Sequence, residues 1–113
     1  MPRNAKSRIV CAEFKNKLFA PKNDKQDTIV VSVEEIEAIR LCDYEGLNQE
    51  EAANAMDVSR GTLQRILYQA RAKTAQALSE GKAILINGGN YETKDSNVGC
   101  KRNCKRCMLG NKK

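Results

Sequence analysis

Histidine and tryptophan are absent from this sequence of 113 residues, and aromatic side chains make up only 4% of it. Without histidine the chain lacks the side chain that most often acts as a general acid or base, and also the commonest metal ligand. It has no glycine-rich phosphate loop either, and a chain this short offers little material for a substrate pocket. We therefore expect that the protein is not an enzyme.

Long hydrophobic runs are also missing. No apolar stretch approaches the roughly 18 residues that a membrane-spanning helix needs. The apolar segment 9–12, which follows the basic N-terminus, is too short for the core of a signal peptide. These absences predict a cytoplasmic protein with no membrane partner. In that compartment the five cysteines are expected to be thiols or metal ligands rather than disulfides.

Charge, by contrast, is abundant and unevenly distributed. The chain has 20 Lys and Arg against 14 Asp and Glu, a net charge of +6. Residues 32–58 contain eight acidic side chains and one basic, whereas residues 59–82 contain five basic and one acidic. Both ends of the chain are basic. This pattern indicates a surface that binds a polyanion, with the acidic block facing elsewhere.

Local signals predict three helices between short extended segments. Residues 8–14 and 28–31 favour strands, residues 15–28 a loop, and residues 83–87 a further short strand. The helices are expected over residues 32 to about 45, 48 to about 56 and 59 to about 80. Their capping signals are Ser32 with Glu35, Asn48 with Glu51, and Ser59, and their stop signals include Gly46 and Gly81. The apolar positions at helical spacing in the third helix are Leu63, Ile66, Leu67, Ala70, Thr74, Ala77 and Leu78.

The stretch 49–68 is typical of a helix-turn-helix. Ala53 supplies the small residue at the helix contact, and Asp57 occupies the turn position where a positive φ is needed. Buried aliphatic side chains are expected at Val58, Leu63 and Ile66. The other side of the second helix then carries residues suited to base edges and phosphates. The predicted DNA-binding residues are Ser59, Arg60, Thr62, Gln64, Arg65, Tyr68 and Arg71. The alternative is an ordinary three-helix bundle whose outer residues are simply solvated.

Two family resemblances rest on these residues. The run Glu37-Ala-Ile-Arg-Leu-Cys-Asp-Tyr-Glu-Gly-Leu-Asn-Gln-Glu-Glu-Ala-Ala53, with Met56-Asp-Val-Ser-Arg-Gly-Thr-Leu63, looks like the region-4 helix-turn-helix of bacterial sigma factors. Together with the segments 32–41 and 81–89, it resembles uncharacterised protein family 0251, small prokaryotic proteins predicted to bind DNA. The resemblance covers roughly residues 2–89, although the Pro-rich segment expected near residues 15–28 is replaced by Lys- and Asn-rich sequence.

This resemblance implies a mainly α fold: a three-helix helix-turn-helix of the sigma region-4-like, winged-helix-like superfamily, with short flanking β segments. It implies no enzymatic activity. Three parts of the chain are expected. They are a basic extended segment 1–31, a DNA-binding domain 32–89 that ends in a short strand, and a flexible basic cysteine-rich tail 90–113.

Three cysteines of the tail, Cys100, Cys104 and Cys107, lie within eight residues. Their C-x-x-x-C-x-x-C spacing is similar to the iron–sulfur site of radical-SAM enzymes, whose large barrel a chain of this length cannot form. Without histidine, a four-coordinate zinc or a fully protein-bound [4Fe–4S] cluster needs a fourth thiolate. Cys11 is the candidate for that ligand, and Cys42 is expected to be a packing residue. A redox disulfide, or a basic tail with incidental thiols, remains an alternative.

The sequence therefore predicts a transcriptional regulator that reads the major groove of double-stranded DNA. Its cysteine cluster would sense zinc, an iron–sulfur cluster or redox state. A homodimer is expected because paired half-sites multiply specificity. The alternative is a small metal- or cluster-binding protein whose helix-turn-helix contacts RNA polymerase or another protein. RNA binding is the weaker third prediction, because aromatic stacking platforms are scarce.

Overall fold

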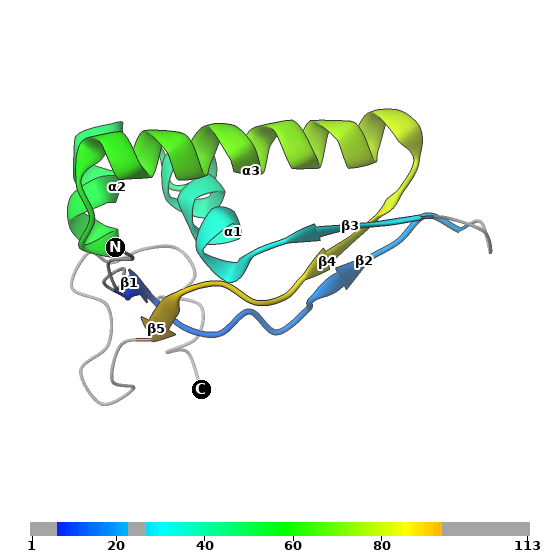
Figure 1. Ribbon diagram of the computed structural model, residues 1–113, viewed down its shortest axis with the longest axis horizontal. Helices are drawn as coiled ribbons and strands as arrows, with labels where there is room; N and C mark the ends of the chain where they lie inside the picture. The colour runs from blue at the N-terminus through cyan, green and yellow to red at the C-terminus, as the bar shows by residue number, and fades with distance from the viewer. Residues whose placement is uncertain (1–6, 23–26, 94–113) are drawn as a thin grey trace, which may run out of the picture.

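The computed structural model of the chain describes residues 7–22 and 27–93. Within these ranges, three helices are flanked by two small sheets in a compact globule, as the sequence predicted (Figure 1). In chain order the elements are β1 (Arg8–Val10), β2 (Leu18–Phe19), β3 (Thr28–Val31), α1 (Val33–Ile39), the π-helical segment η1 (Arg40–Tyr44), α2 (Gln49–Met56), α3 (Arg60–Glu80), β4 (Ala83–Ile86) and β5 (Tyr91–Thr93).

The predicted helix starts are confirmed. Ser32 and Asn48 each form a complete capping box, with Glu35 and Glu51 respectively. The Ser59 Oγ accepts a hydrogen bond of 3.1 Å from the Thr62 N–H. Each box satisfies backbone donors that a helix N-terminus otherwise leaves without partners. The sequence therefore sets where all three helices begin.

The helix ends also lie close to the predicted positions. Asp57 ends α2 with φ 58° and ψ 48°, and Gly81 ends α3 with φ 69°. The first helical stretch reaches Tyr44, close to the predicted Glu45, and Gly46 follows with φ 84°. What was not predicted is that α1 ends at Ile39 and the stretch continues as the π-helical segment η1. There the Glu45 N–H bonds to the Arg40 carbonyl, five residues back, at 2.8 Å. The wider turn brings Arg40 between the carboxylates of Glu37 and Glu45, at 2.8 and 3.0 Å.

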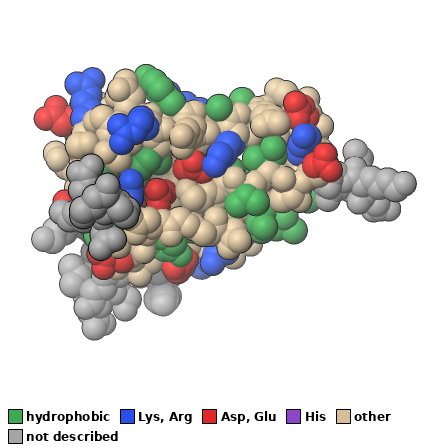
Figure 2. Space-filling model, in the orientation of Figure 1, with side chains coloured by type: hydrophobic (Ala, Val, Ile, Leu, Met, Phe, Trp, Pro, Cys, Tyr) green, Lys and Arg blue, Asp and Glu red, His purple; other side chains and the backbone are tan. Residues whose placement is uncertain are grey.

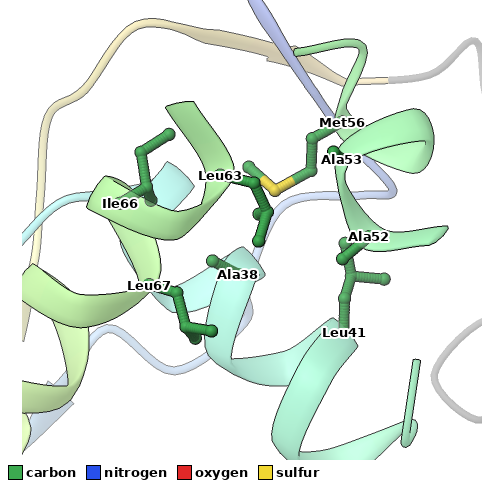
Figure 3. Close-up of a cluster of buried hydrophobic side chains, with 8 residues drawn as sticks. All are labelled: Ala38, Leu41, Ala52, Ala53, Met56, Leu63, Ile66 and Leu67. Atoms are coloured by element: carbon green, nitrogen blue, oxygen red, sulfur yellow. The ribbon is translucent and has the colours of Figure 1, made fainter. Parts of the chain in front are cut away.

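The main hydrophobic core lies where α1, η1 and α2 meet the first half of α3 (Figure 3). Its buried members are Ala38, Leu41, Ala52, Ala53, Met56, Leu63, Ile66 and Leu67. This core is what fixes α2 against α3. The prediction that Leu78 also faces the core is wrong, since its side chain is 76% exposed. The second half of α3 extends past α1 and α2 (Figure 1), and Ala77 is the buried residue there.

The strands form two separate sheets. In one, β4 lies between antiparallel β2 and parallel β3, and in the other β1 pairs in parallel with β5. A second, smaller core of Val10, Val33 and Ile86 lies between these sheets and α1.

Three local predictions about the strands need correction. The first strand ends at Val10 instead of reaching Phe14, β2 lies within the predicted loop 15–28, and β5 lies within the predicted flexible tail. Both unpredicted strands are two or three residues long. They exist because of partners about 65 to 85 residues away in the sequence. In the part of the chain that the structure describes, no helix is long and apolar enough to span a membrane.

Candidate nucleic-acid interface

The connection between α2 and α3 is short and closed by backbone hydrogen bonds. The Asp57 N–H bonds to the Asn54 carbonyl at 3.2 Å, and the Val58 N–H bonds to the Ala53 carbonyl at 3.0 Å. The left-handed conformation of Asp57 reverses the chain after α2, as its position in the sequence predicted. Ala53 is buried in the core shared with α3, where a side chain with no atoms beyond Cβ permits close approach.

The first half of α3 presents a polar surface on the side opposite this core. We call it the outer face of α3 and define it by Ser59, Arg60, Thr62, Gln64, Arg65 and Tyr68. All of these are exposed except Thr62, which is half-buried. Leu63, Ile66 and Leu67 point the other way, into the core. The structure thus brings six of the seven predicted DNA-binding residues together on one surface.

Side chains of the outer face bond to one another along the helix. The Ser59 hydroxyl donates to Thr62 Oγ1 at 3.0 Å, and the Arg65 guanidinium donates to the same oxygen at 3.3 Å. One turn further on, the Gln64 amide donates to the Tyr68 hydroxyl at 3.2 Å. These contacts hold the longer side chains close to the helix surface, which restricts their rotamers before any ligand binds.

Arg71, the seventh predicted residue, has a different environment. Its guanidinium makes two hydrogen bonds, of 2.7 and 3.2 Å, to the carboxylate of Asp43 in η1. Its neighbour Lys73 contacts both carboxylate oxygens of Glu35, at 2.9 and 3.1 Å. The cations in the middle of α3 are therefore paired with the acidic block of α1 and η1. Figure 2 shows Lys and Arg side chains along the length of α3 in this view.

The structure describes two of the five cysteines, Cys11 and Cys42. Cys11 is buried just after β1, and its N–H donates to Glu37 Oε2 at 3.1 Å. Its sulfur is engaged in a disulfide, so the prediction that the cysteines are thiols or metal ligands rather than disulfides is wrong for Cys11. Cys42 is a free thiol, half-buried against the main core as the sequence predicted. Burial and the neighbouring Asp43 raise the pKa of the Cys42 thiol.

The other predicted metal ligands, Cys100, Cys104 and Cys107, lie outside the described residues. Over residues 7–22 and 27–93, no group of three or more His, Cys, Asp or Glu side chains is arranged to hold a metal ion.

Comparison with known proteins places the chain in a family. The family model described as "Protein of unknown function DUF134" matches residues 1–94. A UPF0251 protein of Ruminiclostridium cellulolyticum is 45% identical over 95% of this chain and 91% of its own length. The chain belongs to the UPF0251 family. Similar UPF0251 proteins occur in Caldicellulosiruptor bescii, at 48% identity over 95% of this chain and 74% of the relative, and in Clostridium botulinum, at 46% over 95% and 68%. No solved structure matches.

Two side-chain pairings on this UPF0251 surface were not predicted, Gln64 with Tyr68 and Arg71 with Asp43. The pairing of Gln64 with Tyr68 has a sequence signal, because residues four apart on a helix are neighbours. The pairing of Arg71 with Asp43 has none, since 28 residues and two changes of chain direction separate them. Sequence reasoning therefore identified the outer face correctly as a cluster but placed Arg71 in it without seeing its partner.

Proposed function

We propose that this UPF0251 protein is a DNA-binding transcriptional regulator. In this proposal α2 and α3 form a helix-turn-helix of the sigma region-4-like type, and the outer face of α3 enters the major groove. The observation that carries the proposal is the outer face itself. Ser59, Arg60, Gln64, Arg65 and Tyr68 are exposed together on one side of a helix whose other side is fixed in the core. Rigid presentation of such residues is what reading base edges requires.

Electrostatics favour the first half of α3 as the reading surface. Arg60 and Arg65 form no ion pair with any other described residue, whereas Arg71 and Lys73 do. The first turn of α3 contains no acidic residue, unlike that of α2, which contains Glu50 and Glu51. The positive end of the α3 dipole therefore remains available to a phosphate group.

Roles for the individual side chains follow from their chemistry. Arg65 suits the two acceptors of guanine, and Gln64 can donate to and accept from adenine. Ser59 and Thr62, at the start of the helix, suit phosphate oxygens. On this assignment Gln64 and Arg65 determine the sequence that is bound, while the residues of the first turn fix the position of α3 on the backbone.

Selection of bound duplexes from a random DNA pool tests the proposal. We expect a defined consensus, and strongly salt-dependent binding to it. Gln64→Ala should weaken binding to the consensus by about 10-fold or more and relax one base position. The matched control is Gln76→Ala, which removes an exposed glutamine from the same helix beyond the outer face. If Gln64→Ala and Gln76→Ala bound the selected site equally well, α3 would not be the recognition helix.

We also propose that Cys11 and the tail cysteines Cys100, Cys104 and Cys107 bind zinc or an iron–sulfur cluster and so regulate the protein. The parallel register of β1 and β5 supports this, because Val10, next to Cys11, lies opposite Thr93. Cys100 follows Thr93 by seven positions, a span of up to about 25 Å when extended. The Cys11 sulfur cannot form a disulfide and bind a metal as a thiolate at the same time. Metal binding by Cys11 therefore requires the disulfide to be reduced.

Anaerobic purification followed by metal analysis and visible absorption spectroscopy tests the metal proposal. Cys11→Ser should lower the bound metal or the cluster absorbance, and Cys42→Ser, which changes a packing thiol, should not. A metal-free, colourless protein that binds its DNA site with full affinity would leave the helix-turn-helix proposal standing and eliminate the cysteine site. Tight binding to RNA polymerase without DNA binding would instead favour a protein-contact role for α2 and α3.

A further inference from the structure

Gln64 and Tyr68 lie one helical turn apart on the outer face of α3, and both side chains are exposed. The Gln64 Nε2 donates a hydrogen bond of 3.2 Å to the Tyr68 hydroxyl. Side chains on a helix lean back toward its N-terminus, so the ring of Tyr68 projects over the turn that carries Gln64. Two torsions place a tyrosine ring, whereas the amide of glutamine lies at the end of three. The hydroxyl is therefore the more fixed member of the pair, and it holds the amide.

This contact changes which hydrogen bonds the Gln64 amide can offer to another molecule. A primary amide has two N–H donors and one carbonyl acceptor. Tyr68 takes one of the donors, and within residues 7–22 and 27–93 the side chain of Gln64 has no other hydrogen-bond partner. One N–H and Oε1 remain, so the amide offers one donor beside one acceptor.

The remaining donor and acceptor match adenine and not guanine. In the major groove adenine presents the N7 acceptor and the N6 donor, whereas guanine presents two acceptors, N7 and O6. A free amide could turn both of its N–H groups toward guanine. With one N–H held by Tyr68, Oε1 of Gln64 would face an acceptor of guanine instead, and a desolvated acceptor without a donor lowers affinity. The Tyr68 hydroxyl thus favours adenine by rejecting guanine.

A second glutamine of α3 shows what is particular to this pair. Gln76 also donates to a residue four positions later, the carboxylate of Glu80, at 3.3 Å. That acceptor is negatively charged, and it also pairs with Lys82 at 3.0 Å. A carboxylate beside the base-reading amide would repel the phosphate groups of DNA, whereas the neutral hydroxyl of Tyr68 does not. The partner of Gln64 is thus one that can stay in place when DNA approaches.

We propose that Tyr68 is a positioning residue that sets Gln64 to accept adenine and reject guanine at one base pair. This inference rests on the proposed DNA binding and deepens it by naming the base that Gln64 reads. Tyr68 acts through the Gln64 amide, so its hydroxyl needs no contact of its own with DNA. The bound duplex carries an A·T pair at the position that Gln64→Ala relaxes.

Tyr68→Phe tests the inference, because it removes the hydroxyl and keeps the ring. Fluorescence anisotropy measures binding to the selected duplex and to a copy with G·C at the base pair read by Gln64. The ratio of the two affinities should fall by about 2- to 10-fold in Tyr68→Phe, the range expected for one hydrogen bond. Tyr91→Phe is the matched control. It removes a hydroxyl that bonds to Glu13 at 2.9 Å, away from α3 (Figure 1), and should not change the ratio.

A double-mutant cycle separates positioning from direct contact. Once Gln64→Ala has removed the amide, adding Tyr68→Phe should weaken binding no further, whereas two independent contacts with DNA would give additive losses. NMR of the free protein adds a readout that needs no DNA. Tyr68→Phe should shift the side-chain amide signals of Gln64 and leave those of Gln76 in place, and circular dichroism will report whether each variant retains the wild-type helix content.

The outcomes distinguish this inference from the proposed function. Additive losses in the cycle, an unchanged affinity ratio in a folded Tyr68→Phe, or guanine at the position that Gln64→Ala relaxes would overturn the inference while the proposed function stands. Gln64 amide signals that Tyr68→Phe does not shift would overturn it as well. A wild type that selects no duplex would instead remove the proposed function and, with it, the role given to Tyr68.

Discussion

The guanidinium of Arg71 and the carboxylate of Asp43 form a two-point ion pair, with Nη2 and Oδ1 2.7 Å apart. The hydrogen bonds that Arg71 donates to Asp43 are the main reason why the pKa of Arg71 is raised. The pair connects the middle of α3 to η1, and both side chains remain about half exposed. Arg71, which the sequence predicts to contact DNA, is thus paired with the carboxylate of Asp43 in the same chain.

Asp43→Asn should release Arg71 for phosphate contact. We expect tighter non-specific binding to duplex DNA and a slope of log K against log salt that is steeper by about one. The free energy of unfolding should fall by less than about 1 kcal/mol, because the ion pair is half-exposed. Fluorescence anisotropy at several salt concentrations measures the slope.

The control for that experiment is Glu13→Gln, which removes the same unit of negative charge beside Lys17, away from α3. It should tighten non-specific binding less than Asp43→Asn and leave the salt slope nearly unchanged. Equal effects from the two variants would mean that net charge, rather than the release of Arg71, controls binding.

Leu63 and Leu78 lie on the same helix but should respond very differently to truncation. Leu63 is completely buried in the main core, whereas Leu78 is exposed. Leu63→Ala should lower the free energy of unfolding by about 2–5 kcal/mol, and Leu78→Ala by less than about 0.5 kcal/mol. Urea denaturation followed by circular dichroism gives both values. A large loss at Leu78 would show that its side chain is covered in solution.

The turn residue Asp57 should tolerate glycine but not valine. Its φ of 58° lies in the left-handed region, which Asp adopts more readily than β-branched residues do. Asp57→Val should destabilise the protein by about 1–2 kcal/mol and weaken DNA binding in parallel, because the turn sets how α3 follows α2. Asp57→Gly should leave the stability and the DNA affinity close to those of the wild type. Thermal unfolding and anisotropy on the same samples test this.

Cys42 should be a slow nucleophile at neutral pH. Burial and the negative charge of Asp43 raise the pKa of its thiol, so the reactive thiolate is scarce. Because the pKa is higher in the folded than in the unfolded state, Cys42 stabilises the fold below its unfolded pKa. That contribution disappears as the pH rises through the folded pKa. Mass spectrometry can measure the rate of alkylation of Cys42 from neutral to alkaline pH. This rate should rise at a higher pH in the folded protein than in the denatured protein.

The features that were predictable from sequence are those that a few consecutive residues determine. The capping boxes at Ser32 and Asn48 and the turn at Asp57 each depend on side chains within three or four positions of the backbone that they fix. The outer face of α3 follows from helical periodicity in the same way. Short stretches of sequence were therefore sufficient to predict the structure of the segment that we propose binds DNA.

The features that were missed depend on distant partners. β2 and β5 are too short to have a propensity of their own and exist through pairing with β4 and β1. Leu78 has the right spacing for a core position, but α3 runs beyond the elements that could cover it. Neither the two strands nor the exposure of Leu78 can be read from a short window of sequence. The π-helical turn at Arg40 is the exception, because the carboxylates that pair with Arg40 lie three positions before it and five positions after it.

The parallel pairing of β1 with β5 has a consequence for the order of folding. Arg8 bonds through its N–H to the carbonyl of Asn90, which lies 82 positions later. During synthesis the helices can form from local contacts, but β1 must wait until nearly the whole described chain has left the ribosome. Closing so long a loop is slow and comes late. The pairing of β1 with β5 is therefore among the last contacts to form as the protein is made.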